Sequence, residues 1–67
     1  MKNTIRVERA IKNLTQEELA KLVSVSRQTI NAMESGKYVP STVLALKVAR
    51  VFEKPVEAIF SLEESDL

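Results

Sequence analysis

Residues 16–35, QEELAKLVSVSRQTINAMES, contain two short amphipathic helical patterns separated by a break of three or four residues. The apolar positions of this segment recur at helical spacing: Leu19, Val23, Val25, Ile30 and Met33. Ala20 stands where two helices that cross steeply leave room only for a small side chain. Since the other positions are mostly polar, the segment predicts two helices that share one buried face and are joined by a tight turn.

The second helix of this pair begins with four hydrogen-bonding residues, Ser26-Arg27-Gln28-Thr29. We expect them to project away from the buried face, which is how a helix-turn-helix reads the major groove of DNA. Gln28 can present its amide to adenine N6 and N7, and Arg27 can either bind guanine O6 and N7 or clamp a phosphate. The alternative is that both are merely solvated residues in the first turn of an exposed helix.

Capping residues predict where the first two helices begin and end. The first helix is expected over residues 4–12, with Thr4 as its N-cap and Asn13 in the left-handed conformation that ends it. Thr15 and Glu18 have the spacing of a capping box, in which each side chain satisfies a free backbone N–H of the other. The second helix is therefore predicted to begin at residue 16.

The same signals continue toward the C-terminus. Ser26 is the expected N-cap of a third helix that runs to about Glu34, and Gly36 supplies the positive φ that ends it. Ser41 is expected to cap a long apolar helix that ends near Phe52. This fourth helix is predicted to be the buried central helix.

Pro55 predicts the first turn of a last short helix, from residue 55 to about residue 60, followed by an acidic tail over residues 61–67. Residues 1–3 and 60–62 could also pair as a minimal two-stranded ladder. The expected fold is therefore all-α, a compact five-helix arrangement in one domain over residues 1–67.

Composition removes several function classes. The chain has 67 residues with no Cys and no His, which excludes zinc fingers, Cys nucleophiles, His general bases and imidazole-bound metals. Neighbouring Glu17 and Glu18 point about 100 degrees apart on a helix and do not form an acid–base pair. We expect no enzyme activity, no metal, no cofactor and no small-molecule ligand.

Size and hydropathy bear on assembly and location. A chain this short buries a small fraction of its surface, and without disulfides or metals, oligomerisation is the remaining way to add stability. No apolar run reaches the length of a membrane span, and the first residues lack the apolar region of a signal peptide. We expect a cytoplasmic protein that does not enter a membrane.

Charge is distributed unevenly, although the net charge is only +1. Residues 1–50 carry nine Lys or Arg and four Glu, a balance of +5, whereas residues 51–67 have a balance of −4. A basic body can face phosphates while an acidic end points away. The alternative, an ordinary surface of mixed charge, is equally compatible with the charges alone.

The segment LTQEELAKLVSVSRQTINAMESGKYVPS, residues 14–41, resembles the Cro/C1-type (XRE) helix-turn-helix repressors of phages and bacteria. The resemblance covers nearly the whole chain. It is strongest with minimal single-domain members that end soon after an "IF" pair, here Ile59-Phe60, among them the small dimeric cytolysin-regulator type. The resemblance implies a five-helix, sequence-specific DNA-binding protein.

The resemblance also assigns roles to residues. It implies a phosphate contact for Gln16 at the start of the second helix, and contacts to the DNA backbone for Lys37 and Tyr38. Ala32 falls where some relatives carry a longer base-contacting residue. The expected DNA-binding residues are Gln16, Ser26, Arg27, Gln28, Thr29, Asn31, Lys37 and Tyr38.

Other interpretations of four of these residues stay open. Thr29 could touch a thymine methyl group or bond back into its own helix. Lys37 could bind phosphate or favour a helix dipole. Tyr38 could donate to a phosphate or cover the edge of the core. Asn31 could be a secondary contact or a bystander.

Two further features follow from the resemblance. Ser24 occupies a turn position that is often Gly in the family, so a residue with a Cβ must adopt a left-handed or distorted conformation there. Arg9 and Glu34 are implied to form a structural ion pair between the first and third helices.

The C-terminal region carries a cluster of apolar residues, Val56, Ile59, Phe60 and Leu62. A chain this short has little further core to fill, so we expect them to form a two-fold dimer interface that places two copies of the third helix about 34 Å apart. The alternative is that Ile59 and Phe60 pack within one chain.

These observations lead to one main hypothesis, a homodimeric transcriptional regulator, and specifically a repressor, that binds an inverted-repeat operator in double-stranded DNA. The alternative is an antitoxin-like or other protein-interaction module for which DNA binding is secondary.

Overall fold

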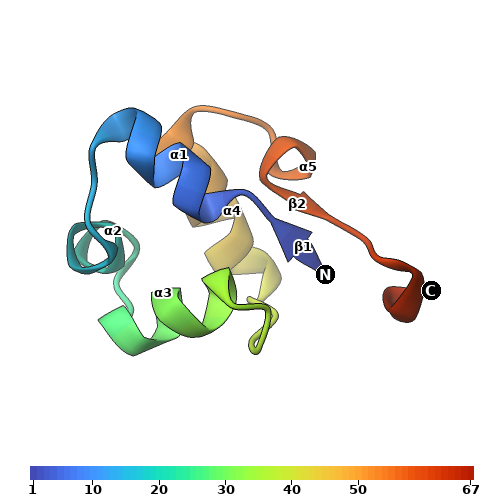
Figure 1. Ribbon diagram of the computed structural model, residues 1–67. Coiled ribbons are helices and arrows are strands. Elements are labelled where there is room, and N and C mark those ends of the chain that lie inside the picture. The colour runs from blue at the N-terminus through green and yellow to red at the C-terminus, as the bar shows by residue number, and fades with distance from the viewer.

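The computed structural model describes all 67 residues, and it confirms the all-α fold with a minimal ladder. Short capped helices and two paired strands follow one another in the order β1 (Lys2–Asn3), α1 (Ile5–Lys12), α2 (Gln16–Val23), α3 (Arg27–Glu34), α4 (Thr42–Phe52), α5 (Val56–Ile59), β2 (Phe60–Ser61) and the 3₁₀ helix η1 (Glu64–Asp66). In Figure 1, α4 runs through the middle behind α1, α3 lies along the lower edge beside α2, and both termini lie on the side away from α2. None of these helices has the length and apolar character needed to cross a membrane.

The core lies between α4 and the helices around it. Its buried apolar side chains come from each of the five α-helices and from β2: Ile5, Leu19, Ala20, Val23, Ile30, Met33, Leu44, Val48, Ala49, Phe52, Ile59 and Phe60. Burial of such side chains is the main favourable term for a chain of this size. The core holds the back of α3 in place and leaves the opposite side of that helix in solvent.

The expectation of a buried central helix is correct for only one face of α4. Leu44 and Val48 are buried, whereas Val43 and Leu46 are more than half exposed. The sequence is apolar on both faces of this helix, and the chain has too few other elements to cover the second face. An unpartnered apolar strip therefore remains on α4.

Local capping determines where α2, α3 and α4 start. At α2, Glu18 N donates to Thr15 Oγ1 at 3.0 Å and Thr15 N donates to Glu18 Oε1 at 2.8 Å, so the expected capping box is present. The hydroxyl oxygens of Ser26 and Ser41 accept from backbone N–H groups of α3 and α4. These serines act as the sequence predicted.

The start of α1 differs from the prediction. Thr4 occupies the N-cap position, but its side chain accepts no capping hydrogen bond. Asn3 Oδ1 accepts from Ile5 N at 3.2 Å instead, and Asn3 Nδ2 donates to Met33 O at 2.8 Å. A side chain in β1 therefore does the capping and also ties the beginning of α1 to the end of α3.

Residues with a left-handed backbone conformation follow the first four α-helices. Asn13 (φ 57°), Ser24 (φ 60°) and Gly36 (φ 76°) adopt the conformations that the sequence suggested, and Glu53 (φ 56°) was not foreseen. After α3, Gly36 N donates to Met33 O at 3.1 Å and the next N–H donates back across the turn, as in a Schellman motif. Asn13, Ser24 and Glu53 each bend the chain sharply, so α1, α2 and α3 follow one another, and α5 follows α4, with very short connections.

The C-terminal part departs from the prediction in two ways. Pro55 has an extended ψ of 152° and precedes α5 as its N-cap, and Phe60 lies in β2 and not in the helix. Residues 61–67 are not a free tail. Lys2 pairs with Ser61 and Asn3 with Phe60 in the antiparallel ladder, and the Met1 ammonium group lies 2.9 Å from both Glu63 Oε1 and Asp66 Oδ2.

Candidate nucleic-acid interface

The exposed side of α3 carries the first two candidate residues. Arg27 and Gln28 are exposed in the first turn of α3, and neither side chain makes a hydrogen bond or an ion pair within the chain. Ile30 and Met33 on the opposite side are buried in the core. Asn31, one turn after Arg27, is also exposed. The polar side of α3 is therefore rigidly supported from behind and has free hydrogen-bonding groups in front.

The two hydroxyl residues at the start of α3 are partly engaged. Ser26 Oγ accepts from Thr29 N at 3.2 Å and lies 3.0 Å from Thr29 Oγ1. Thr29 thus bonds back toward its own helix, one of the two alternatives that the sequence left open. Its methyl group remains as the part of the side chain that is free for an outside contact.

The loop after α3 is fastened to the helix. The carbonyl oxygen of Ala32 accepts from Lys37 N at 2.9 Å, Tyr38 N at 3.2 Å and Ser35 Oγ at 3.1 Å. The Lys37 side chain is exposed and has no carboxylate partner. The loop therefore presents a free cation at the end of α3.

Tyr38 lines a shallow hollow of about 240 Å³ on the exposed side of α3, together with Gln28, Thr29 and Ala32. The side chain is 43% exposed and does not belong to the core cluster. Both interpretations of Tyr38, a phosphate contact and a cover over the edge of the core, therefore stay open.

Gln16, the first residue of α2, is less free than the sequence suggested. Its Nε2 donates to Glu34 Oε1 at 3.1 Å, so one of the two amide hydrogens is engaged within the chain. The other amide hydrogen remains, as does the backbone N–H in the first turn of α2, which has no partner within the helix. A phosphate at this point would find two donors.

The same carboxylate joins α3 to α1. Glu34 Oε2 accepts from Arg9 Nε at 2.6 Å, and Glu34 Oε1 accepts from Arg9 Nη2 at 3.1 Å. Arg9 Nη1 also donates to Leu14 O at 2.9 Å. The structural pair implied by the family resemblance is thus present, as a two-pronged ion pair that also holds the connection to α2.

The Arg9–Glu34 ion pair is largely buried, and burial affects the charge state of Glu34. The Glu34 side chain is 2% exposed and that of Arg9 is 16% exposed. Burial alone would raise the pKa of the Glu34 carboxyl, but the hydrogen bonds from Arg9 and Gln16 outweigh it and hold that pKa below its ordinary value. Glu34 is therefore charged at neutral pH, and its charge fixes the orientation of α3.

Arg6 is a residue near this network that the sequence reasoning missed. Its Nε lies 3.7 Å from Glu34 Oε1, and its side chain is 79% exposed. Arg6 and Arg9 are three residues apart on α1, the spacing that puts two side chains on one helix face. That spacing was the available signal, and it places a second cation beside the start of α2.

The residues expected at a dimer interface separate into two groups. Ile59 is 2% exposed and belongs to the core, so it has no surface for a partner, and the expectation was wrong for this residue. Phe60 is 8% exposed and belongs to the same core, so the alternative in which Ile59 and Phe60 pack within one chain describes both residues. Val56 is half-buried. Leu62 is 67% exposed.

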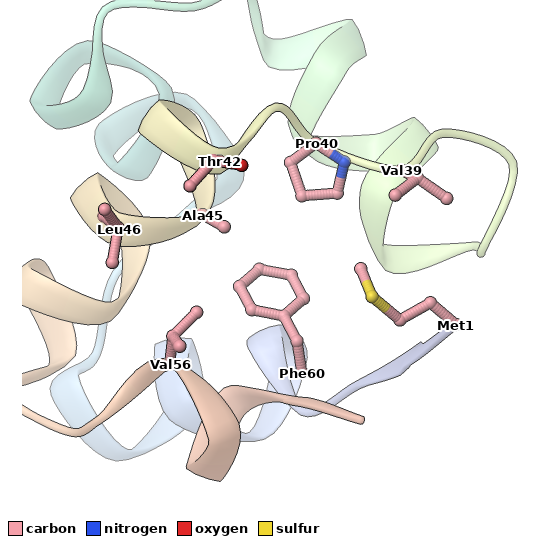
Figure 2. A pocket seen from close by; sticks show the side chains of 8 residues that line it. All are labelled: Met1, Val39, Pro40, Thr42, Ala45, Leu46, Val56 and Phe60. Atoms are coloured by element: carbon pink, nitrogen blue, oxygen red, sulfur yellow. The ribbon is translucent and has the colours of Figure 1, made fainter. Parts of the chain in front are cut away.

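Phe60 and Val56 form part of an apolar groove of about 250 Å³. Figure 2 shows the Phe60 ring and the Met1 side chain pointing into the same space, with Leu46 and Val39 on opposite sides of it. The groove residues come from both ends of the chain, from the loop before α4 and from α4 itself. Sequence reasoning found only two of its eight lining residues, Val56 and Phe60.

The acidic C-terminal segment lies far from the start of α2, and the structure contains no cluster of metal-ligating side chains. The acidic C-terminal segment is held at the N-terminus by the contacts of Met1 with Glu63 and Asp66, at the end of the molecule away from α2 in Figure 1. No group of three or more acidic, His or Cys side chains is arranged to hold a metal ion.

Comparisons with known proteins agree with this arrangement. The sequence matches the helix-turn-helix family model over residues 5–59. An HTH-type transcriptional regulator of Methanocaldococcus jannaschii is 53% identical over 66 residues, which is 98% of this chain and all of that protein. An HTH-type transcriptional regulator of Bacillus subtilis is 46% identical over 66 residues, with the same coverage of both chains.

A solved structure is similar as well. The restriction-modification controller protein C.AhdI from Aeromonas hydrophila superposes with a TM-score of 0.77 at 32% identity, covering 84% of this chain and 85% of that one. The family model, the relatives and the architecture agree over most of the sequence. The chain belongs to the Cro/C1-type (XRE) helix-turn-helix family and is a DNA-binding transcriptional regulator.

Proposed function

We propose that residues 1–67 act as one DNA-binding domain of a homodimeric repressor that reads an inverted-repeat operator through α3. One observation carries this proposal. Arg27 and Gln28 stand free of any internal partner in the first turn of α3, while the back of that helix is fixed in the core. The proposed partner is double-stranded DNA, and the proposed place of action is the cytoplasm.

The proposed contacts divide by role. Gln28 reads an adenine through N6 and N7, and Arg27 reads a guanine or clamps a phosphate next to it. Asn31 is a secondary contact on the same exposed side. Phosphates bind at Lys37 and at the start of α2, where Gln16 offers its remaining amide hydrogen and its backbone N–H.

Ser26 and Tyr38 complete the proposed DNA-facing set. The Ser26 hydroxyl is used to cap α3, so its contribution is to hold Arg27 and Gln28 in position at the helix start. Tyr38 stands in the loop that is hydrogen-bonded to Ala32, at the other end of α3. These two residues frame the reading surface.

The dimer is proposed to form through the apolar groove and the exposed side chains around it. Leu46, Val39 and Phe60 line the groove. Leu62, two residues after Phe60 in the sequence, is exposed. A two-fold contact would remove this surface from water in both copies. A protomer measures 32 × 22 × 20 Å along its principal axes, so two copies can reach successive major-groove segments about 34 Å apart.

Selection of bound duplexes from a random pool tests the proposal directly. We expect an enriched inverted repeat whose half-sites lie about 10 base pairs apart, centre to centre. Gln28→Ala should lose about 1–3 kcal/mol of discrimination at one base pair in each half-site. Gln16→Ala is the matched control, because it removes the same side chain from a phosphate contact and should lower affinity without changing the preferred sequence.

Two results would overturn the proposal. An unchanged sequence preference for Gln28→Ala would show that this residue does not read a base. A chain that stays monomeric in sedimentation, both free and on DNA, would remove the two-fold arrangement. In the second case the open groove would favour the protein-interaction alternative, in which a partner protein covers Leu62 and Phe60.

A further inference from the structure

A separate hollow lies between the end of α2 and the second half of α4. It has a volume of about 370 Å³ and is lined by Leu22, Ser24, Lys47, Arg50 and Val51, none of which lines the apolar groove or the hollow beside α3. We propose that it is a docking site for a segment of a partner protein in which an apolar side chain stands next to acidic residues. This inference goes beyond DNA binding and does not depend on which bases α3 reads.

The two cations of the hollow have no partner within the chain. Lys47 and Arg50 are exposed and lie three residues apart on α4, the spacing that puts two side chains on one helix face. By contrast, all the basic residues of α1 and the one in the loop after α4 are paired with carboxylates. A carboxylate group from another molecule would therefore be complementary to the charge of the hollow.

Leu22 and Val51 give the hollow an apolar part. Leu22 is 59% exposed, and Val51 is half-buried against the core. An apolar side chain of a partner would remove the exposed Leu22 surface from water, which is favourable. A free inorganic anion offers no such group. The combination of free cations and exposed apolar surface favours a peptide segment that carries both kinds of side chain.

Backbone carbonyl groups beside the hollow favour a peptide over DNA. The carbonyl oxygens of Leu22 and Val51 accept no hydrogen bond within the chain, and Pro55, four residues after Val51, has no N–H to donate. These carbonyls belong to the last turns of α2 and α4, where the partial negative charge of a helix end repels phosphates. A peptide brings N–H donors to such oxygens, whereas the DNA backbone brings only acceptors.

The position of the hollow separates it from the proposed dimer contact. The apolar groove uses the first half of α4 and residues near both chain ends, and in Figure 1 both termini lie on the side away from α2. The acidic segment of a second copy is a less suitable occupant, because Glu63 and Asp66 each lie 2.9 Å from the Met1 ammonium group. The occupant that fits the charges is therefore a different protein.

Peptide selection tests the proposal without knowledge of the partner. A phage-displayed library of random linear peptides is selected against the folded protein, and enriched peptides are synthesised for fluorescence anisotropy. We expect enriched sequences in which an apolar residue is flanked by Asp or Glu. Lys47→Glu and Arg50→Glu should each weaken their binding by about tenfold or more, because like charges then face each other.

Two further variants separate charge from apolar contact. Lys2→Glu is the matched control for Lys47→Glu, because it changes the net charge equally at an exposed position in β1. It should change peptide affinity by less than about twofold, since charges more than about 10 Å apart are largely screened at 0.1 M salt. Leu22→Ala should weaken peptide binding by about threefold to fivefold through lost apolar contact. Circular dichroism confirms that each variant is folded.

Binding to a mixed-sequence DNA duplex distinguishes docking from a DNA contact. Lys47→Glu should lower DNA affinity no more than Lys2→Glu does. A larger loss together with a shallower salt dependence would show that the hollow binds phosphates, and the proposal would be wrong.

Three results with peptides would also overturn the proposal. The first is a selection that enriches no acidic and apolar sequence. The second is an equal response of the enriched peptides to Lys47→Glu and Lys2→Glu. The third is a synthetic peptide of residues 61–67 that binds as tightly as the enriched ones, which would identify a second copy of this chain as the occupant.

Discussion

Replacing Arg9 by methionine tests how much the fold depends on the charge of Glu34. The substitution keeps a long side chain but removes three hydrogen bonds, at 2.6 and 3.1 Å to Glu34 and at 2.9 Å to Leu14 O. The Glu34 carboxylate, 2% exposed, would then keep only Gln16 at 3.1 Å and Arg6 at 3.7 Å. An uncompensated buried charge is among the most destabilising changes that one substitution can make.

The expected magnitude follows from that burial. Breaking a buried pair by removing one partner costs about 3–5 kcal/mol, and the two remaining partners of Glu34 place this case near 3 kcal/mol. A domain of this size has a total stability of about 3–10 kcal/mol. The melting temperature should fall by about 12–24 °C, since each kcal/mol corresponds to about 4–8 °C in a small domain. Urea unfolding followed by circular dichroism gives the free energy.

The pH dependence gives a second, independent signature. In the native protein the pKa of Glu34 lies below its ordinary value of 4.5, so the stability that the pair supplies is present above pH 4.5 and is lost as the pH falls through the native pKa. Without Arg9, burial dominates and the pKa of Glu34 rises above 4.5. Protonation of Glu34 then removes the uncompensated buried charge from the Arg9→Met protein. The difference in stability between the two proteins should therefore shrink between pH 7 and pH 4.

The Lys12–Glu53 pair is the matched control. Its Nζ–Oε1 distance is 2.7 Å, but its side chains are 35% and 79% exposed. Lys12→Met should cost much less than Arg9→Met, because exposed pairs are screened by water. Equal losses from Lys12→Met and Arg9→Met would refute the argument from burial. An Arg9→Met defect that stays constant from pH 7 to pH 4 would refute the role assigned to Glu34.

Three further predictions concern the turn, the DNA backbone and the dimer. Gly36→Ala should cost about 1 kcal/mol in urea unfolding, because an L side chain is strained at φ 76° although the added Cβ meets no atom within 4 Å. Lys37→Ala should lower affinity for all sequences alike and should reduce the slope of log K against log salt concentration by about one per half-site in a binding titration. Leu46→Glu should leave the protein folded, because this side chain is 55% exposed. If the proposed dimer forms through the groove, this variant should be monomeric in sedimentation equilibrium and should bind DNA more weakly.

Local signals in the sequence predicted most helix ends. The capping box at Thr15 and the serine caps at Ser26 and Ser41 depend on residues within three positions, so their chemistry can be read without a tertiary structure. Gly36 likewise needed only a positive φ after α3. These elements were foreseen because the interactions that define them are short in sequence.

The features that sequence reasoning missed or misplaced depend on contacts between residues far apart in the sequence. Asn3 replaces Thr4 as the cap of α1 because β1 is placed by its pairing with β2, far away in the chain. The bond from Gln16 to Glu34 joins residues 18 positions apart, and no local pattern points to it. Ile59 was assigned to a surface that its burial excludes, because apolar character alone does not distinguish the core from an interface.

The fastening of the loop to α3 has a consequence for the speed of binding. With Lys37 and Tyr38 both anchored on one carbonyl oxygen, α3 and the loop that follows it move as a single preformed unit. Binding then needs no folding step, and little conformational entropy is lost on the DNA. Encounter rates should accordingly be governed by diffusion and electrostatic attraction, and differences among operators should reside in how long each complex lasts.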